Sequence, residues 1–143
     1  MHLMDKLGQS IVHINRLYEQ WAKQQGISNS NLLWVYHSLI HHQNRTQQEI
    51  CDEFDIAKQT LSPLCKELVA QGILEISPIC TDKREKRWQL TEKGRLAATP
   101  IIERLRQFEQ QAFDTLGKQE SEKLLALTQQ FGEILERQLQ GKG

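Results

Sequence analysis

Residues Leu74–Gly94 read LEISPICTDKREKRWQLTEKG, and this stretch decides the fold. Two short β-prone runs, Leu74–Ser77 and Lys86–Leu90, flank a loop that contains Pro78 and four cations within five residues. The second run leads into residues 91–94, TEKG, where a threonine before an acidic first turn is typical of a helix start. The stretch therefore predicts a two-stranded hairpin with a charged tip, placed between helices.

Two helical segments precede the hairpin. Thr46 and Glu49 form the threonine-x-x-glutamate pattern of a capping box, which predicts a helix over 47–54. Asp55-Ile56 then interrupts the pattern, and a second helix is predicted over 57–71, with Gly72 just past its C-terminus. Both helices have apolar positions at helical spacing, which are Ile50, Cys51 and Phe54 in the first and Leu61, Leu64, Cys65, Leu68 and Val69 in the second.

The second helix leaves a polar face between its apolar positions. Its outward residues are Lys58, Gln59, Thr60, Ser62 and Lys66. Amides, hydroxyls and cations near the N-terminus of a second helix are residue types that read base edges and bind phosphates in the major groove. A charged hairpin after such a pair of helices is a wing, which holds the DNA backbone or enters the minor groove. The alternatives are a plain helical hairpin with a polar face and a solvated β-hairpin with ordinary surface lysines. The order of the polar helix face, the short break and the charged hairpin favours DNA binding.

With these features the chain resembles the MarR family of winged-helix transcriptional regulators. The residues that carry the resemblance lie in the second helix, the hairpin and the segment behind it, and are Thr60, Leu61, Ser62, Leu68, Gly72, Asp82, Lys83, Arg84 and the run LTEKG at 90–94. The resemblance spans nearly the whole chain. It implies that Arg84 inserts into the minor groove, that Asp82 braces it, and that residues 58–66 face the major groove.

The sequence departs from the family pattern at two positions. Ala57 stands where a serine often caps the recognition helix, so that cap is weaker or is supplied by Asp55. Pro63 lies inside the predicted recognition helix, where it removes one backbone donor. The predicted DNA-binding residues are then Thr46, Gln47, Lys58, Gln59, Thr60, Ser62, Lys66, Asp82, Lys83, Arg84, Lys86 and Arg87.

The charge balance neither requires nor excludes nucleic acid. The chain has 18 cations and 18 anions and a formal net charge of zero, which is unusual for a DNA-binding protein. Residues 46–94 hold seven cations against nine anions, whereas the loop 82–87 holds four cations against two anions. DNA binding is therefore predicted from the placement of charge, and we expect modest affinity at high salt because few phosphates can be neutralised.

Both ends of the chain carry amphipathic helices. Apolar residues recur at steps of three and four at Leu7, Ile11, Ile14, Tyr18 and Trp21, and again at Leu124, Leu127, Phe131 and Ile134. We expect one domain over 1–143, with a core at about 28–94 and dimerisation helices at about 4–25 and 95–140. A homodimer would bury both stripes and present two recognition helices to a palindromic operator in double-stranded DNA. The alternative is that these helices pack on their own domain.

The remaining segment, 28–42, predicts a helix capped by Ser28 or Ser30, with a broad apolar surface and three histidines. His37 and His41 have the i, i+4 spacing of metal ligands, but no third ligand is near in sequence, so partly buried histidines are expected and no metal site is predicted. The family binds effectors where this helix meets the dimerisation helices. The resemblance thus implies a pocket for a small aromatic effector, with Trp21, Trp34, Tyr36 and His37 as loose candidates.

Other function classes find little support. The sequence has no glycine-rich phosphate loop and no nucleophile elbow, so we expect no catalytic residue, no enzyme activity and no cofactor. Three cysteines, at 51, 65 and 80, form an odd set that suits a reducing cytosol, and no apolar run is long enough for a membrane. The predicted location is cytoplasmic.

The sequence therefore predicts a mainly α fold with a small β-hairpin wing, a winged helix-turn-helix with N- and C-terminal dimerisation helices. The predicted function is a sequence-specific DNA-binding transcriptional regulator, acting as a homodimeric repressor that a small molecule releases from DNA. The alternatives are a winged-helix protein-interaction adaptor that binds no DNA, and a metal- or redox-sensing regulator of the same fold.

Overall fold

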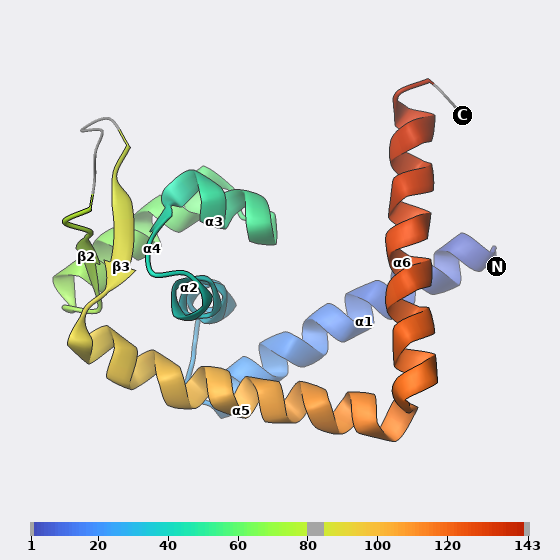
Figure 1. The fold of residues 1–143 in the computed structure, drawn as a ribbon, viewed down its shortest axis with the longest axis horizontal. Coiled ribbons are helices and arrows are strands. Elements are labelled where there is room, and N and C mark those ends of the chain that lie inside the picture. Colours follow the sequence, from blue (N-terminus) through green and yellow to red (C-terminus); the bar gives the residue numbers. More distant parts are fainter. Residues whose placement is uncertain (1, 80–84, 142–143) are drawn as a thin grey trace. The chain divides into compact units, whose positions relative to one another are not determined.

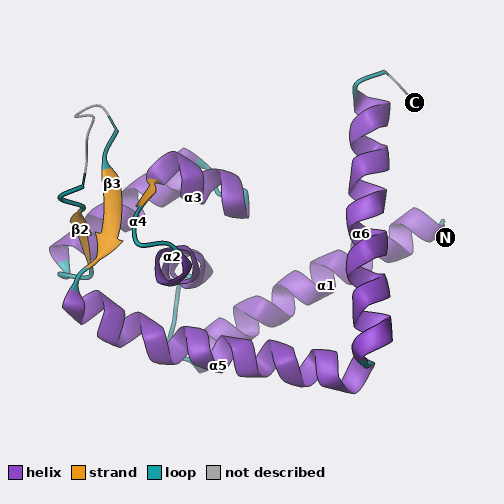
Figure 2. Cartoon of the chain, viewed as in Figure 1, coloured by secondary structure: helices purple, strands orange, loops and turns teal. Residues whose placement is uncertain are grey.

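Helices make up most of the chain, and a small sheet is formed by one short strand before α3 and two strands after α4 (Figures 1 and 2). The computed structural model describes residues 2–79 and 85–141. The predicted wing residues Asp82, Lys83 and Arg84, like Cys80, lie outside the described residues. The elements in chain order are α1 (Leu3–Gln24), α2 (Ser30–His41), β1 (Arg45–Thr46), α3 (Gln47–Phe54), α4 (Lys58–Ala70), β2 (Leu74–Ile76), β3 (Arg87–Leu90), α5 (Glu92–Leu116) and α6 (Lys118–Leu139). They form two compact units, residues 1–103 and 104–143.

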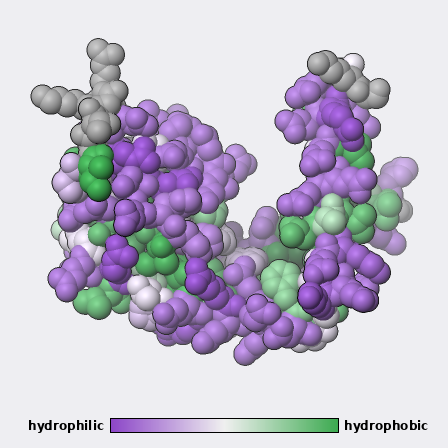
Figure 3. All heavy atoms as spheres, in the orientation of Figure 1, coloured by the Kyte–Doolittle hydropathy of each residue, from purple (hydrophilic) through white to green (hydrophobic). Residues whose placement is uncertain are grey.

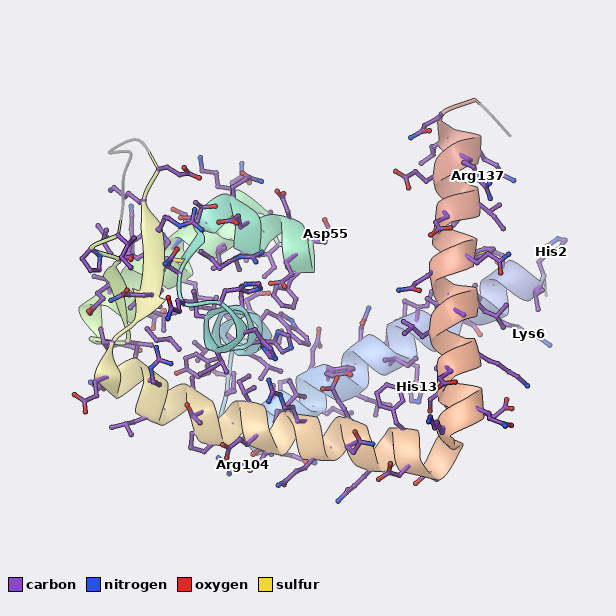
Figure 4. All side chains as sticks on the ribbon, in the orientation of Figure 1. His2, Lys6, His13, Asp55, Arg104 and Arg137 are labelled. Atoms are coloured by element: carbon purple, nitrogen blue, oxygen red, sulfur yellow. The ribbon has the colours of Figure 1, made fainter. Side chains whose placement is uncertain are left out.

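The helix-turn-helix follows the prediction closely. The Thr46 hydroxyl accepts a hydrogen bond from the Glu49 backbone N–H (3.1 Å), and the Glu49 carboxylate accepts one from the Thr46 N–H (2.9 Å), so the capping box is confirmed. Asp55, labelled at the end of α3 in Figure 4, has a left-handed backbone (φ 51°) that ends this helix. Gly72 follows α4 with φ 75°, as a left-handed C-terminal cap requires.

The structure corrects the predicted cap of α2 and decides between the two alternatives for the cap of α4. The α2 helix begins at Ser30, and its N-cap is Asn29, whose side-chain oxygen accepts from the Asn31 N–H at 3.0 Å; the predicted serine cap is wrong. Asparagine is as good an N-cap as serine, so composition alone did not separate the neighbours. The α4 helix begins at Lys58, and within the described part of the chain no side chain caps it, from Asp55 or elsewhere.

The sheet has three strands rather than the two of a hairpin. Its order is β1-β3-β2 and both pairings are antiparallel. Strand β1 pairs with β3, with Arg45 opposite Trp88 and Thr46 opposite Arg87. Because β1 lies directly before α3, this pairing joins the hairpin to the start of α3. A two-residue strand is too short to show alternation, which is why the sequence pattern did not predict it.

The root of the hairpin is held against the start of α5. The Thr91 backbone N–H donates to the Ile73 carbonyl (3.0 Å), and the Thr91 hydroxyl donates to the Gly72 carbonyl. The same hydroxyl accepts from the Gly94 N–H at 3.0 Å, so Thr91 caps α5 as predicted. The end of α4, the sheet and the start of α5 are thus held together around Gly72 and Ile73.

The core of the first unit is built from the apolar faces of α2, α3 and α4 and from the strands. Its most completely buried side chains include Leu33, Leu39, Ile50 and Leu61. Trp21 at the end of α1 is also buried, at 8% exposure, although Leu7, Ile11 and Ile14 on the same predicted stripe are exposed. The predicted N-terminal stripe is therefore split between the core and the surface of this unit.

The second unit consists of the last part of α5 and of α6, joined at Gly117, whose φ of 98° ends the first helix where the sequence predicted a break. No residue of α6 is buried in this unit. Figure 3 shows apolar side chains, in green, at the surface in the region of α6. The exposed apolar residues of this helix include Leu124, Leu127, Phe131 and Ile134. None of the described helices combines the length and apolar character that a bilayer crossing requires.

Candidate nucleic-acid interface

The α4 helix presents a polar face to solvent. Leu61, Leu64 and Leu68 are buried, and because they recur every three to four residues they leave the other side of the helix outward. Lys58, Gln59, Thr60 and Lys66 are exposed on that side, and Ser62 is partly exposed. This is the arrangement that the sequence predicted for α4.

The N-terminus of α4 is favourable for an anion. Among the residues described, Ala57 caps the helix with its backbone alone, so the first N–H groups receive no side-chain oxygen. Those N–H groups carry the positive end of the helix dipole, and Lys58 adds a full positive charge at the first helical position. Pro63 lies within the helix, and its missing N–H leaves the Gln59 carbonyl without its usual intrahelical donor. A phosphate oxygen would find several donors at this helix end.

A groove of about 510 Å³ lies between α3, α4 and β3 in the first unit. Its lining residues are Thr46, Gln47, Gln48, Lys58, Ser62, Cys65, Lys66, Glu85, Lys86 and Trp88. Six of them, Thr46, Gln47, Lys58, Ser62, Lys66 and Lys86, were predicted as DNA-binding residues, although they are separated by up to 40 positions in sequence. The surface around α3 and the hairpin is mainly hydrophilic (Figure 3).

Sequence reasoning missed Gln48 and Trp88 on the wall of this groove. Gln48 occupies the second position of α3, and its amide donates to the Asp52 carboxylate at 2.8 Å. Trp88 lies on β3 with a partly exposed ring, opposite Arg45 on one side and Ile76 on the other. The alternation of β3 was a usable signal for Trp88, but no pattern in the sequence identified Gln48.

Arg87 is held by other protein groups. Its Nε donates to the Asn44 side-chain oxygen (2.5 Å), Nη2 lies 3.1 Å from a Glu49 carboxylate oxygen, and Nη1 lies 3.6 Å from Glu85. Its side chain is 27% exposed, so the guanidinium is only partly open to solvent. The predicted contact of Arg87 with DNA remains a prediction, and the structure adds these intramolecular partners to it.

Glu49 lies at the centre of these polar contacts. Its carboxylate accepts from the Thr46 N–H and pairs with Arg87, and it lies 4.0 Å from Arg45 Nε. The Thr46 backbone N–H is the main cause that holds the pKa of Glu49 below its usual value, against a smaller effect of burial. The Thr46 hydroxyl and the cations of Arg87 and Arg45 lower the pKa further. Thr46 itself is 8% exposed and serves as a helix cap, so its side chain is already used within the fold.

The two described cysteines are buried small residues. Burial raises the pKa of Cys51 and raises the pKa of Cys65 to about 11, with the neighbouring Cys51 adding to the second effect. A thiol reacts through its thiolate, so both are kept in the unreactive form at neutral pH.

The predicted effector residues separate into two environments. Trp21 and Tyr36 are buried in the core, and burial raises the pKa of the Tyr36 phenol. Trp34 instead stacks on Phe54 with ring centroids 5.3 Å apart, and His37 meets Phe54 edge-on at 5.6 Å. This aromatic cluster lies where α1, α2 and α3 meet.

A pocket of about 390 Å³ opens beside the aromatic cluster. Its lining residues are Asn15, Tyr18, Glu19, Ser30, Asn31, Trp34 and Phe54. Only Trp34 of these was predicted, because the other residues come from three different helices and no sequence pattern relates them.

His37 and His41 lie close together, with ring centroids 4.3 Å apart. The His41 Nδ1 is 2.7 Å from the His37 carbonyl, so it donates to that oxygen. In the part of the chain that the structure describes, no group of three or more histidine, cysteine, aspartate or glutamate side chains could hold a metal ion.

Comparison with known proteins gives a consistent picture. A sequence model of the MarR family matches residues 37–85, which cover the end of α2, both helices of the helix-turn-helix and the first part of the hairpin. The MarR family regulator NMB1585 from Neisseria meningitidis is 31% identical, with 100% of both chains covered and a TM-score of 0.86. No curated protein sequence matches the chain.

Two further solved structures are similar. AbfR from Staphylococcus epidermidis, in its reduced form bound to DNA, is 26% identical with a TM-score of 0.68, and covers 93% of this chain and 94% of its own. NadR in complex with 4-hydroxyphenylacetate is 18% identical with a TM-score of 0.72, over 94% of this chain and 92% of its own, and shares the fold. With a regulator of known family matched along its entire length and a helix-turn-helix that carries a three-stranded sheet, this chain belongs to the MarR family of transcriptional regulators.

Proposed function

We propose that this chain binds DNA in a sequence-specific manner, with α4 in the major groove and the wing on the adjacent backbone or minor groove. The observation that carries the proposal is the groove between α3, α4 and β3, where Lys58 and Lys66 of α4 come together with Lys86, the residue before β3. Lysines at such a surface neutralise phosphates, and Gln59 and Thr60 in the exposed first turn of α4 have the donors and acceptors that read base edges. AbfR, which is 26% identical, is bound to DNA in its solved structure and supports this function.

We further propose that the regulator is a homodimer. The α1 helix exposes Leu7, Ile11 and Ile14 in the first unit, and α6 exposes Phe131 and Ile134 in the second. Apolar stripes of this length on two helices favour burial against another chain. A two-fold symmetric pair would place two α4 helices on successive major-groove faces of a palindromic operator. Residues 28–94 would then serve as the DNA-binding core, with the helices on either side as dimerisation elements.

The pocket lined by Tyr18, Trp34 and Phe54 supports a role for a small aromatic effector. Its volume of about 390 Å³ falls at the small end of the range for ligand pockets, and aromatic walls with a few polar groups are usual in such sites. Because Phe54 is the last residue of α3, a ligand there would act on the helix-turn-helix directly. We propose that such a ligand releases the protein from DNA and that the regulator acts as a repressor.

Selection of bound fragments from random double-stranded DNA tests the proposed function. We expect a two-fold symmetric motif to be enriched, and Lys58→Ala with Lys66→Ala to abolish the enrichment. Lys23→Ala on the exposed end of α1 is the matched control for loss of a positive charge, and it should leave the motif unchanged. Failure of the wild-type protein to enrich any DNA would favour the adaptor function. Binding that depends on zinc or on oxidation would favour a metal- or redox-sensing regulator instead.

A further inference from the structure

The Arg87 side chain connects the wing strand β3 to α3 and to the residue before β1. Backbone pairing places Arg87 opposite Thr46 of β1, and on the other side its carbonyl accepts from the Ser77 N–H at 2.7 Å. The Arg87 side chain then crosses to the start of α3, where it meets Asn44 and Glu49. Arg87 therefore contacts strand β1 through its backbone, and the residue before β1 and helix α3 through its guanidinium.

The geometry of these contacts requires an arginine. Nε donates to Asn44 while Nη2 reaches Glu49, and the two partners lie in different segments. A guanidinium holds its donors in a rigid fork, whereas a lysine ammonium is a point charge on a flexible stem and fixes no comparable angle. The Glu49 carboxylate is itself fixed, because it accepts from the Thr46 N–H in the capping box. The fork therefore connects β3 to a group that cannot rotate freely.

We propose that Glu49 and Arg87 are positioning residues, which set the angle of the wing against the α3–α4 pair so that both reach DNA together. This inference rests on the proposed DNA-binding function and adds to it a role for an acidic side chain at the interface. It assigns to Arg87 a structural contact with Glu49 and Asn44 in place of a phosphate contact.

Removal of the Glu49 charge should change DNA affinity in opposite directions, depending on whether Glu49 acts only through its charge or also holds the wing in place. Glu49 directly follows Gln47 and Gln48, which line the groove, so removal of its negative charge should strengthen binding to a polyanion if charge alone mattered. If Glu49 holds the wing in place, the same change should weaken binding. Glu49→Gln is the suitable substitution, because a glutamine oxygen can still accept from the Thr46 N–H and keep the helix cap, while the contact with Arg87 loses its negative partner and becomes an ordinary hydrogen bond.

The test measures the affinity of three variants for the DNA that the wild-type protein selects. The variants are Glu49→Gln, Arg87→Lys and a control. We expect each of the first two to weaken binding about five- to tenfold, as when a charge-assisted hydrogen bond is replaced by a weaker one. Asp52→Asn is the matched control: it removes one negative charge from the same helix, its oxygen can still accept from Gln48, and it pairs with no residue of the sheet in the described contacts. The affinity of Asp52→Asn for the selected DNA should equal that of the wild type or be slightly higher.

A second readout does not depend on DNA. Amide hydrogen exchange in β1 and β3 should be faster in Glu49→Gln and Arg87→Lys than in the wild type, and unchanged in Asp52→Asn. If Glu49→Gln fails to fold, Asn44→Ala removes one arm of the fork outside the helices and should show the same two effects. Wild-type-like affinity and exchange in Glu49→Gln, or tighter binding by it, would overturn the inference. Absence of DNA binding by the wild type would instead refute the proposed function, while the exchange measurement would still test the wing contact.

Discussion

Replacement of Gly94 by alanine is expected to destabilise the fold, although the position is helical. Gly94 is buried in the first turn of α5, against the backbone of Ile73. A Cβ there would lie 3.1 Å from the Ile73 carbonyl carbon and 3.3 Å from its Cα, and closer still to its oxygen. Ile73 cannot simply retreat, because its N–H donates to the Leu68 carbonyl (2.8 Å) and its oxygen accepts from the Thr91 N–H (3.0 Å).

The expected size follows from two opposing effects. Intrinsic helix propensity favours alanine over glycine by about 1 kcal/mol inside a helix. Overpacking of a filled site costs about 1–3 kcal/mol, and here the contact is with backbone, so a cost at the upper end is expected. Displacement of α5 would also weaken the Thr91–Ile73 hydrogen bond, at about 1 kcal/mol. The net result should be a loss of about 2–3 kcal/mol in the free energy of unfolding.

Urea denaturation at one protein concentration measures this difference, since the midpoint of an associating protein depends on concentration. Gly132→Ala is the matched control, because Gly132 lies inside α6, is exposed, and an alanine Cβ at this position would have nothing within 4 Å among the described residues. It should be neutral or raise stability by up to about 1 kcal/mol. Equal stability of the Gly94→Ala and wild-type proteins would show that the packing of α5 on the hairpin root is not as close as described.

Three further outcomes follow from the structure. Replacement of Phe131 and Ile134 by glutamate should dissociate or unfold the protein in sedimentation, and a wild-type monomer at micromolar concentration would contradict the dimer. Binding of an aromatic acid beside Trp34 should change tryptophan fluorescence and lower DNA affinity together; a broad panel without either effect would exclude the proposed pocket. Because burial raises the pKa of Cys65 to about 11, this thiol should resist alkylation at neutral pH until the protein unfolds, and rapid labelling of the native protein, located by mass spectrometry, would count against that environment.

Local signals predicted the helix-turn-helix from sequence alone. The capping box of Thr46 and Glu49 fixes the start of α3, and Gly72 fixes the end of α4, because each depends on residues that are adjacent in the chain. The apolar spacing of α4 then determines which side chains face outward, so the exposure of Lys58 and Gln59 could be predicted.

Features that depend on contacts between distant segments could not be predicted in this way. Arg87 looked like one more cation of the wing, since its partner Asn44 is 43 residues away. Trp21 and Tyr36 were candidate pocket residues because the family binds effectors where their helices meet, but their burial in the core depends on how α1 and α2 pack. Strand β1 is formed only because β3 lies beside it, and no pattern within two residues could reveal that.

A titration across salt and sequence tests the central claim most directly, namely that α4 and the adjoining groove bind DNA with a division between phosphate and base contacts. Lys58→Ala should weaken binding to every variant of the selected site and reduce the slope of log affinity against log salt by about one. Gln59→Ala should instead remove the preference at one base pair, at about 1–3 kcal/mol, and leave the slope unchanged. Identical, sequence-independent losses from both substitutions, or no loss from either, would contradict the account.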